Sequence, residues 1–265
     1  MGYVAFLSIV SALGGLLFGY DTAVISGTIS QVINQFQLTT LQSGWYVGSA
    51  LVGSIIGVIF AGKLSDGLGR KPTMVISAIL FTSSAIGCAL SNNFNDLIIW
   101  RMVGGGGIGI VSVVCPLYIS EISPASHRGR LVSLYQLAIT IGFLAAYLIN
   151  FYLLNLSVNF NSTNLMLHKI FGTEVWRGML GAETLPALLF FIVIFFIPES
   201  PRWLIVKQQK EKAADIFSKI FKTKKEVEFQ IAETEKVLQI QAEETSDWKV
   251  LIQPGFRKAV LIGCA

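Results

Sequence analysis

The chain alternates long apolar runs with short polar breaks, which is the pattern of a protein that crosses a membrane several times. A helix needs about 20 apolar residues to cross the hydrocarbon core of a bilayer. Six runs are long enough, and they predict spanning helices over residues 3–29, 45–62, 72–91, 97–120, 131–154 and 178–197. A seventh apolar run begins near residue 259, so residues 258–265 are interpreted as the start of a truncated seventh helix.

Charged residues are concentrated in one segment near the end of the chain. Residues 199–258 hold 22 of the 36 charged side chains, which leaves 14 for the other 205 positions. Those positions cannot form a water-exposed surface, because soluble domains carry about 25% charged residues and this chain has 14%. We therefore expect an all-α membrane protein, with a transmembrane bundle over residues 1–198 and a cytoplasmic region of short amphipathic helices over residues 199–257.

The basic residues predict which side of the membrane faces the cytoplasm. The connections between spans two and three and between spans four and five hold five Lys or Arg residues, and the segment after span six holds twelve more. The opposite connections hold only Lys169 and Arg177. Because Lys and Arg collect on the cytoplasmic side, both ends of the six-helix unit are expected there, in a cell membrane. Five aromatic residues then fall near the outer interface: Trp45, Tyr46, Trp100, Tyr152 and Trp176.

The side chains that enzymes and metal sites need are sparse. The three cysteines lie in apolar runs without paired spacing, and the two histidines are 41 residues apart. We expect no enzyme activity, no metal and no cofactor. Gly104, Gly106 and Gly109 match a dinucleotide-binding spacing, but they lie inside a predicted spanning helix. The net charge of +4 follows from topology, and nucleic-acid binding is not expected.

Only three ionisable residues fall within the predicted spans, and they fall at one depth. Asp21, Arg101 and Glu183 lie eight, four and five residues from the predicted outer ends of their helices. They are therefore within about 6 Å of each other in depth. Each costs at least about 2.5–3.5 kcal/mol to insert, so a buried cluster is expected. Two interpretations stay open: a carboxylate that carries a proton, and a static salt bridge between helices.

Small and polar residues add two further expectations. Gly15 and Gly19, like Gly53 and Gly57, are four residues apart, which predicts close helix packing. Gln136 in the fifth span would form either an interhelical hydrogen bond or a contact with a ligand.

Four stretches in this order resemble the N-terminal half of a sugar porter of the major facilitator superfamily. They are LGGLLFGYD at 13–21, GKLSDGLGRK at 62–71, PLYISE at 116–121 followed by RGRL at 128–131, and PESPRW at 198–203. The resemblance is greatest to bacterial proton–sugar symporters such as the xylose/proton type, because those symporters have an Asp where Asp21 stands.

The resemblance implies roles for individual residues. Asp21 would be the proton-coupling carboxylate, Arg101 its partner and Glu183 a helper. Sugar hydroxyls would bond to Gln136, while Phe18 and Ile139 would pack on the sugar ring. A cytoplasmic gate of ion pairs would be formed by Asp66, Arg70, Lys71, Glu121, Arg128, Glu199 and Arg202. The family has an Arg directly after the Asp of the loop motif, and Gly67 at that place predicts a weaker latch.

The leading hypothesis is the N-terminal half of a proton-coupled monosaccharide symporter that works by alternating access. Its partners would be a hexose or pentose, the proton, the lipid bilayer and a missing C-terminal six-helix half. Substrate in such proteins binds near the midplane between two halves, so this half alone is not expected to transport. The alternatives are a facilitative sugar uniporter and a truncated or sensor relative that does not transport.

Overall fold

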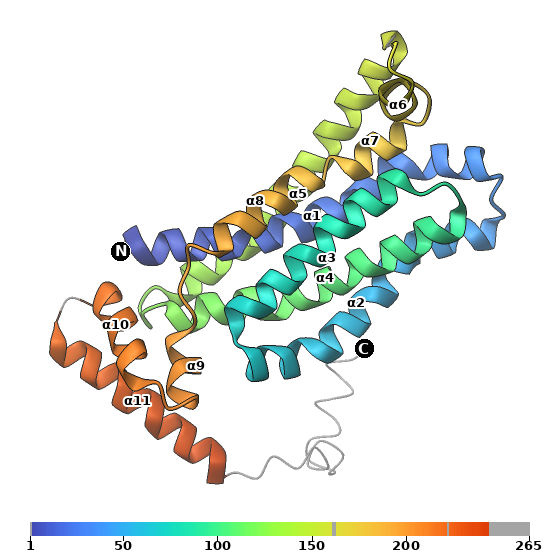
Figure 1. The fold of residues 1–265 in the computed structure, drawn as a ribbon. Coiled ribbons are helices and arrows are strands. Elements are labelled where there is room, and N and C mark those ends of the chain that lie inside the picture. Colours follow the sequence, from blue (N-terminus) through green and yellow to red (C-terminus); the bar gives the residue numbers. More distant parts are fainter. Residues whose placement is uncertain (1, 161–162, 222, 244–265) are drawn as a thin grey trace. The chain divides into compact units, whose positions relative to one another are not determined.

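The part of the chain that the structure describes consists mainly of long helices, and this part contains no β-strand. The computed structural model describes residues 2–160, 163–221 and 223–243 (Figure 1). The predicted seventh helix at 258–265 lies outside the described residues. The chain divides into two compact units, one ending at Trp203 and the other beginning at Leu204.

The first unit holds the membrane helices. Five long helices and a broken sixth follow one another: α1 (Gly2–Phe36), α2 (Thr40–Leu68), α3 (Arg70–Leu90), α4 (Phe94–Ile122), α5 (Arg128–Asn159), the short α6 (Leu165–His168) and π-helical turn η1 (Lys169–Thr173), then α7 (Val175–Gly181) and α8 (Thr184–Ile194). Within the described residues, six helical stretches are long and apolar enough to cross a membrane. The predicted all-α architecture with six spans is therefore confirmed.

Polar partners extend the first helix beyond its predicted end. The apolar run stops near residue 29, yet α1 continues to Phe36. The Gln31 side chain accepts a hydrogen bond from the backbone N–H of Trp176 at 3.0 Å, and Gln35 accepts one from the Trp176 indole at 2.6 Å. These bonds tie the last turns of α1 to α7, which hydropathy alone does not predict.

The sixth span is broken, which corrects the continuous helix predicted over 178–197. Helix α7 ends at Gly181 and α8 begins at Thr184, with Ala182 and Glu183 in a turn between them. Pro186 explains the break, because proline has no N–H to bond the carbonyl four residues earlier and its ring clashes with that carbonyl. That carbonyl belongs to Ala182.

Two of the five predicted interface aromatics are buried instead. Tyr46 and Trp176 have no exposed surface, whereas Trp45 and Tyr152 are exposed. The hydroxyl groups of Tyr46 and Thr28 lie 2.8 Å apart. The position of these rings near a helix end does not show which way they face. They can be buried because their polar atoms have hydrogen-bond partners inside the protein.

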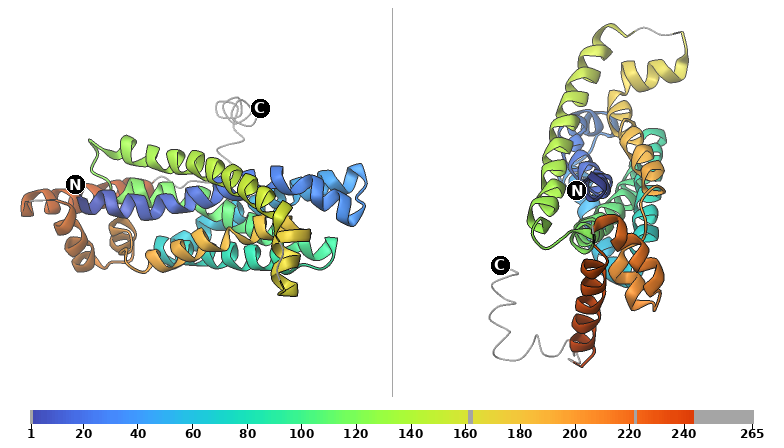
Figure 2. Two further views of the ribbon diagram at one scale, coloured as in Figure 1. Left: turned by 90° about the horizontal axis from the view of Figure 1, so that it is seen from above. Right: turned by 90° about the vertical axis from the view of Figure 1, so that its left-hand side faces the viewer.

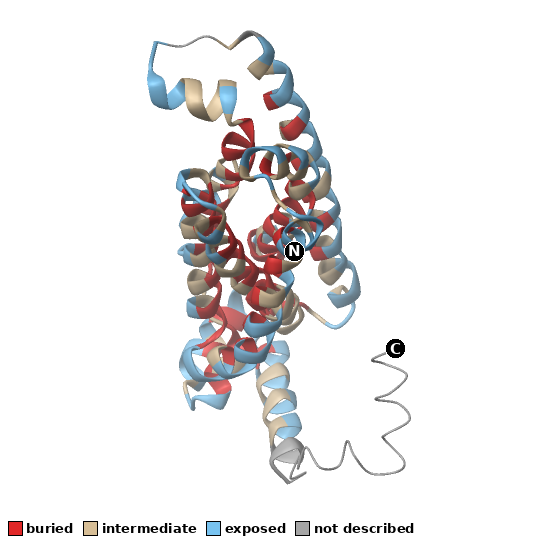
Figure 3. Ribbon diagram, turned by 90° about the vertical axis from the view of Figure 1, so that its right-hand side faces the viewer, coloured by how far each residue is buried: buried red, intermediate tan, exposed pale blue. Residues whose placement is uncertain are grey.

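Glycines bring two pairs of helices into close contact. Helix α1 packs along α5, and α2 packs along α4 (Figure 2). A Cβ atom at Gly19 would overlap the carbonyl of Ile139, and one at Gly53 would overlap the carbonyl of Met102. Buried residues gather on the inward sides of these helices, while the outward sides are exposed (Figure 3). The close packing predicted from the glycine spacing is confirmed at both pairs.

We expect Gly53→Ala to destabilise the protein and Gly48→Ala on the same helix to leave it nearly unchanged. A Cβ at Gly53 meets backbone that must move, which costs about 1–3 kcal/mol. A Cβ at Gly48 has no atom within 4 Å, and alanine favours helix. Thermal unfolding of the two purified variants in one detergent tests the difference. Equal midpoints would show that α2 and α4 are not held by this contact.

The second unit contains helices at the predicted amphipathic segment. Helix α9 (Pro201–Val206) joins the two units in sequence, and α10 (Lys210–Ile220) and α11 (Lys224–Glu243) follow. Helix α10 buries Ala213, Ile216 and Phe217. Lys210 and Glu235 form an ion pair of 2.5 Å between α10 and α11.

Candidate functional site

A buried ion pair joins α1 to α4. The Arg101 Nη1 atom donates a hydrogen bond to Asp21 Oδ1 at 2.6 Å. Both residues are 3% exposed. The structure therefore brings together the acid and the base that the sequence placed at one depth, and neither faces the outer surface of the bundle.

A second carboxylate lies beside this pair. Glu183 is 3% exposed, in the turn between α7 and α8, and it interacts electrostatically with both Asp21 and Arg101. Within the described residues, Asp21 Oδ2, Arg101 Nε and Glu183 Oε1 have no hydrogen-bond partner. Among the described residues, Arg101 thus pairs with Asp21, a second acid lies in the same buried cluster, and unused donor and acceptor atoms remain. Such a cluster can change partners without leaving the protein interior.

The cluster is surrounded by apolar side chains and a few satisfied hydroxyls. Tyr20 donates to the carbonyl of Met179 at 3.1 Å. Val24, Leu97 and Trp176 belong to the same buried core as Tyr20. Charges interact strongly in such surroundings, and an unpaired charge is costly there. Any movement that separates Asp21 from Arg101 therefore has to neutralise or re-pair them.

The three residues expected to contact sugar lie on neighbouring turns of α1 and α5. Gly19, which follows Phe18, packs against Ile139, and Gln136 is three residues earlier on α5. Gln136 is exposed, and its side-chain amide makes no hydrogen bond to other described residues. Ile139 is buried, so its side chain packs within the bundle. The amide of Gln136 is free to bind a polar ligand.

Arg70 is the centre of a second polar cluster, at the opposite ends of the helices. Its Nε and Nη2 atoms donate to the two carboxylate oxygens of Glu121 at 2.9 and 2.8 Å. Its Nη1 atom donates to Asp66 at 3.2 Å and to the carbonyl of Ser65 at 3.0 Å. A bidentate Arg–carboxylate pair fixes both distance and orientation. Helices α2, α3 and α4 are joined at this point.

Glu199 enters this cluster through the main chain. Its carboxylate accepts the backbone N–H groups of Arg70 at 2.8 Å, of Lys71 at 3.2 Å and of Ser200 at 2.7 Å. It thereby caps the N-terminus of α3, where Gly69 has no side chain to do so. Gly69 has a φ of +107°, and a Cβ there would overlap the Glu199 carboxylate. Burial raises the pKa of Glu199, although these hydrogen bonds oppose the shift.

Two residues outside the expected gate also hold it together. The Ser200 hydroxyl donates to Glu121 at 2.6 Å, and the Trp203 indole donates to the carbonyl of Asp66 at 3.0 Å. These bonds explain why residues 199–203 belong to the first unit. Both side chains are in the PESPRW stretch, but neither is ionisable, so a search for ion pairs does not find them.

The remaining gate residues differ in their surroundings. The Lys71 ammonium group donates to the carbonyl of Phe195 at 2.9 Å. Arg202 is half-buried. Arg128 is exposed at the start of α5, and no carboxylate in the described part of the chain pairs with it. The structure therefore does not bring Arg128 into the cluster around Arg70. Gly67 leaves open space where the family motif has an arginine.

Comparison with known proteins identifies the family. Residues 7–265 match the family model described as "Sugar (and other) transporter". The chain is 46% identical to the "Glucose transport protein" of Synechocystis sp. over 82% of its own length and 46% of that protein's. It is 38% identical to the "Arabinose-proton symporter" of Bacillus subtilis over 99% of its length and 54% of that protein's. The chain thus spans about half the length of these curated relatives.

Solved structures support the same assignment. The proton:xylose symporter XylE bound to 6-bromo-6-deoxy-D-glucose is 33% identical, with a TM-score of 0.83 over 95% of this chain and 56% of that one. A partially occluded, inward-open structure of XylE from E. coli has a TM-score of 0.81 over 94% of this chain and 61% of that one. The chain therefore belongs to the sugar transporter family of the major facilitator superfamily, whose members are multi-pass membrane transporters and not enzymes.

Proposed function

We propose that the chain is the N-terminal six-helix half of a proton-coupled monosaccharide symporter. Sugar would bind between this half and a second six-helix half, and the two halves would rock to expose it to either side of the membrane. Relatives named as arabinose-, galactose- and xylose-proton symporters support the substrate class and the coupling. The share of each relative that the chain covers supports the assignment of one half.

The buried cluster of Asp21, Arg101 and Glu183 is the observation that carries the coupling. When Asp21 is ionised, it holds Arg101 and fixes α1 against α4. A proton on Asp21 cancels its charge, so the guanidinium turns to the second carboxylate, Glu183. Helices α1 and α4 are then free to shift, and the proton crosses with the sugar. Without a second acid, protonation would leave Arg101 buried and unpaired.

The second cluster would act as the latch on the cytoplasmic side, with both ends of the six-helix unit facing the cytoplasm. The excess of Lys and Arg at these helix ends supports that orientation. Closure of the latch would hold α2, α3 and α4 together through Arg70, Glu121 and Glu199, and inward opening would require these bonds to break.

Sugar recognition in this half would depend on Gln136, with Phe18 packing beside it. An exposed amide offers both a donor and an acceptor to neighbouring hydroxyls. A site that hydrogen-bonds hydroxyls rejects analogues that lack them. A hexose or a pentose would satisfy these contacts.

Proton-driven accumulation tests the proposal directly. The complete transporter, reconstituted in liposomes with an alkaline interior, is expected to concentrate labelled xylose, glucose or arabinose above the external level. A protonophore should release the accumulated sugar. Uptake that only equilibrates, at the same rate with and without the gradient, would contradict coupling.

A facilitative uniporter is the second candidate. The relative at 46% identity is named as a glucose transport protein without mention of a proton. In a uniporter, the ion pair between Asp21 and Arg101 would only hold helices together. Equilibrative uptake in the same liposomes would favour this candidate, and sugar binding without flux would favour a sensor.

A further inference from the structure

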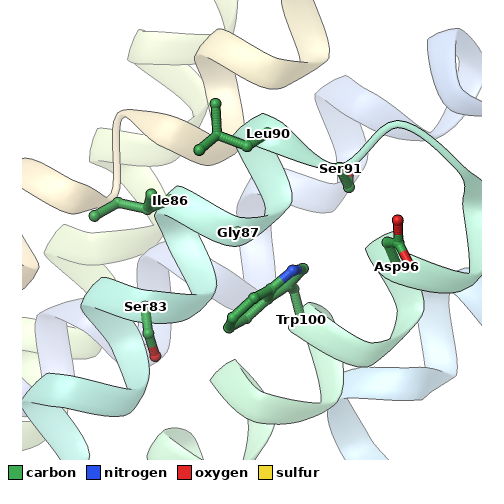
Figure 4. A pocket seen from close by; sticks show the side chains of 7 residues that line it. All are labelled: Ser83, Ile86, Gly87, Leu90, Ser91, Asp96 and Trp100. Carbon is green, nitrogen blue, oxygen red and sulfur yellow. The ribbon is translucent and has the colours of Figure 1, made fainter.

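Two cavities lie on either side of α3, near its connection to α4. One, of about 420 Å³, lies between α3 and α4 and is lined by Ser83, Ile86, Gly87, Leu90, Ser91, Asp96 and Trp100 (Figure 4). The other, of about 550 Å³, lies among α3, α5, η1, α7 and α8. Ile86 and Leu90 line both cavities and form the ridge between them. Neither cavity includes the buried ion pair or the cluster around Arg70.

The first cavity has an acid and a hydrogen-bond donor with capacity to spare. Asp96 Oδ2 accepts a hydrogen bond from the Asn93 side chain at 2.6 Å, and Oδ1 has no hydrogen-bond partner in the described part of the chain. The Trp100 indole N–H likewise has no acceptor among the described residues. Its ring lies over Gly87, where a Cβ would overlap it. The glycine therefore makes room for the indole, and the indole and the Asp96 carboxylate line the same cavity (Figure 4).

The second cavity is apolar along nearly its whole wall. Ile149 and Leu153 of α5, Phe171 of η1 and Leu185 of α8 form much of its lining. Arg177 also borders it, but that side chain is 3% exposed and bonds to Glu174 and to the carbonyl of Ala89. The cavity therefore offers a site for a hydrocarbon chain and no free charge.

We infer that the two cavities bind one phospholipid with a primary ammonium headgroup, that is, a phosphatidylethanolamine. The ammonium group would donate to Asp96, and the indole N–H of Trp100 would donate to a phosphate or ester oxygen. One acyl chain would cross the ridge of Ile86 and Leu90 and lie in the apolar cavity. This lipid would wedge α3 against α4 and α8, beside the turn that holds Glu183.

The chemistry of the lining favours this lipid over other occupants. A carboxylate attracts a cationic headgroup and repels an anionic one. A quaternary ammonium has no N–H to donate, so phosphatidylcholine loses the hydrogen bond. A free sugar would use the polar atoms but would leave the adjoining apolar cavity unfilled. Exposed Ile86 and Leu90 are on a membrane helix, where acyl chains are the surrounding solvent.

Lipid retention tests the inference. The complete protein would be stripped of lipid in detergent, then titrated with phosphatidylethanolamine or phosphatidylcholine of identical acyl chains and examined by native mass spectrometry. We expect one phosphatidylethanolamine per protein, held about tenfold more tightly than phosphatidylcholine. Asp96→Asn should weaken the binding of phosphatidylethanolamine about tenfold and leave the binding of phosphatidylcholine unchanged. Asp215→Asn, an exposed aspartate on α10, is the matched control and should change neither.

The lipid comparison needs no variant, so it stays decisive if Asp96→Asn fails to fold. Equal retention of the two lipids by the unmodified protein would overturn the inference. So would an Asp96→Asn variant that keeps the preference, because the carboxylate would then have no part in it. Displacement of the lipid by millimolar xylose or glucose would overturn it as well and would assign the first cavity to sugar.

Discussion

Asp21→Asn is expected to abolish sugar accumulation while leaving sugar exchange. The amide of Asp21→Asn is nearly isosteric with the carboxylate and can still accept a hydrogen bond from Arg101, but it cannot gain or lose a proton at any working pH. Glu183 remains as the counter-ion of Arg101, so the bundle should still fold. A transporter fixed in the neutral state at position 21 can rock with sugar bound, but it has no carboxylate there to take up and release the coupled proton.

Two assays on the same liposomes separate these outcomes. Uptake of labelled sugar against its own gradient, driven by an alkaline interior, should fall to the equilibrium level in Asp21→Asn. Exchange of internal labelled sugar for external unlabelled sugar should remain within about threefold of the unmodified protein, which is less than 1 kcal/mol. Asp215→Asn on α10 should retain both activities. Undiminished accumulation by Asp21→Asn would refute its role as the proton carrier.

The membrane helices could be predicted because the bilayer imposes one length on every span. Each of the six apolar runs coincides with a helical stretch that is long and apolar enough to cross. Helix ends were less predictable, because they depend on partners distant in the sequence. Gln31 and Gln35 are polar, so they read as loop residues until the structure shows them bonded to Trp176. The break at Ala182 and Glu183 did have a local signal, the proline at 186.

The candidate site was predictable in depth but not in direction. Counting residues from the helix ends placed Asp21, Arg101 and Glu183 at one level, but it could not show which side of each helix they occupy. The burial cost of a charge supplied the missing step, since two acids and a base at one depth are stable only when they face each other. Arg128 had no such constraint, because water at the helix end solvates it, and it lies outside the cluster around Arg70.

The cluster around Arg70 shows a second reason why the type of a residue did not reveal its role. Glu199 was expected in an ion pair, and its hydrogen bonds are to backbone N–H groups at the start of α3. Charge on a side chain suggests charged partners, yet a helix N-terminus also attracts a carboxylate. Gly69, whose φ is positive, directly precedes those N–H groups and leaves the space that the Glu199 carboxylate occupies.

Arg101→Met is expected to destabilise the folded protein by about 3–5 kcal/mol, because it leaves two buried carboxylates without a counter-charge. Methionine is close to arginine in length, so the loss reflects charge more than volume. Adding Asp21→Asn to Arg101→Met removes one of the stranded charges and should recover most of that stability. Denaturant or thermal unfolding of the four proteins in one detergent completes the cycle. The contrary outcome is that the losses in free energy of unfolding of the two single variants add up in the double variant, with no recovery. That result would show that the 2.6 Å contact between Asp21 and Arg101 carries no coupling energy.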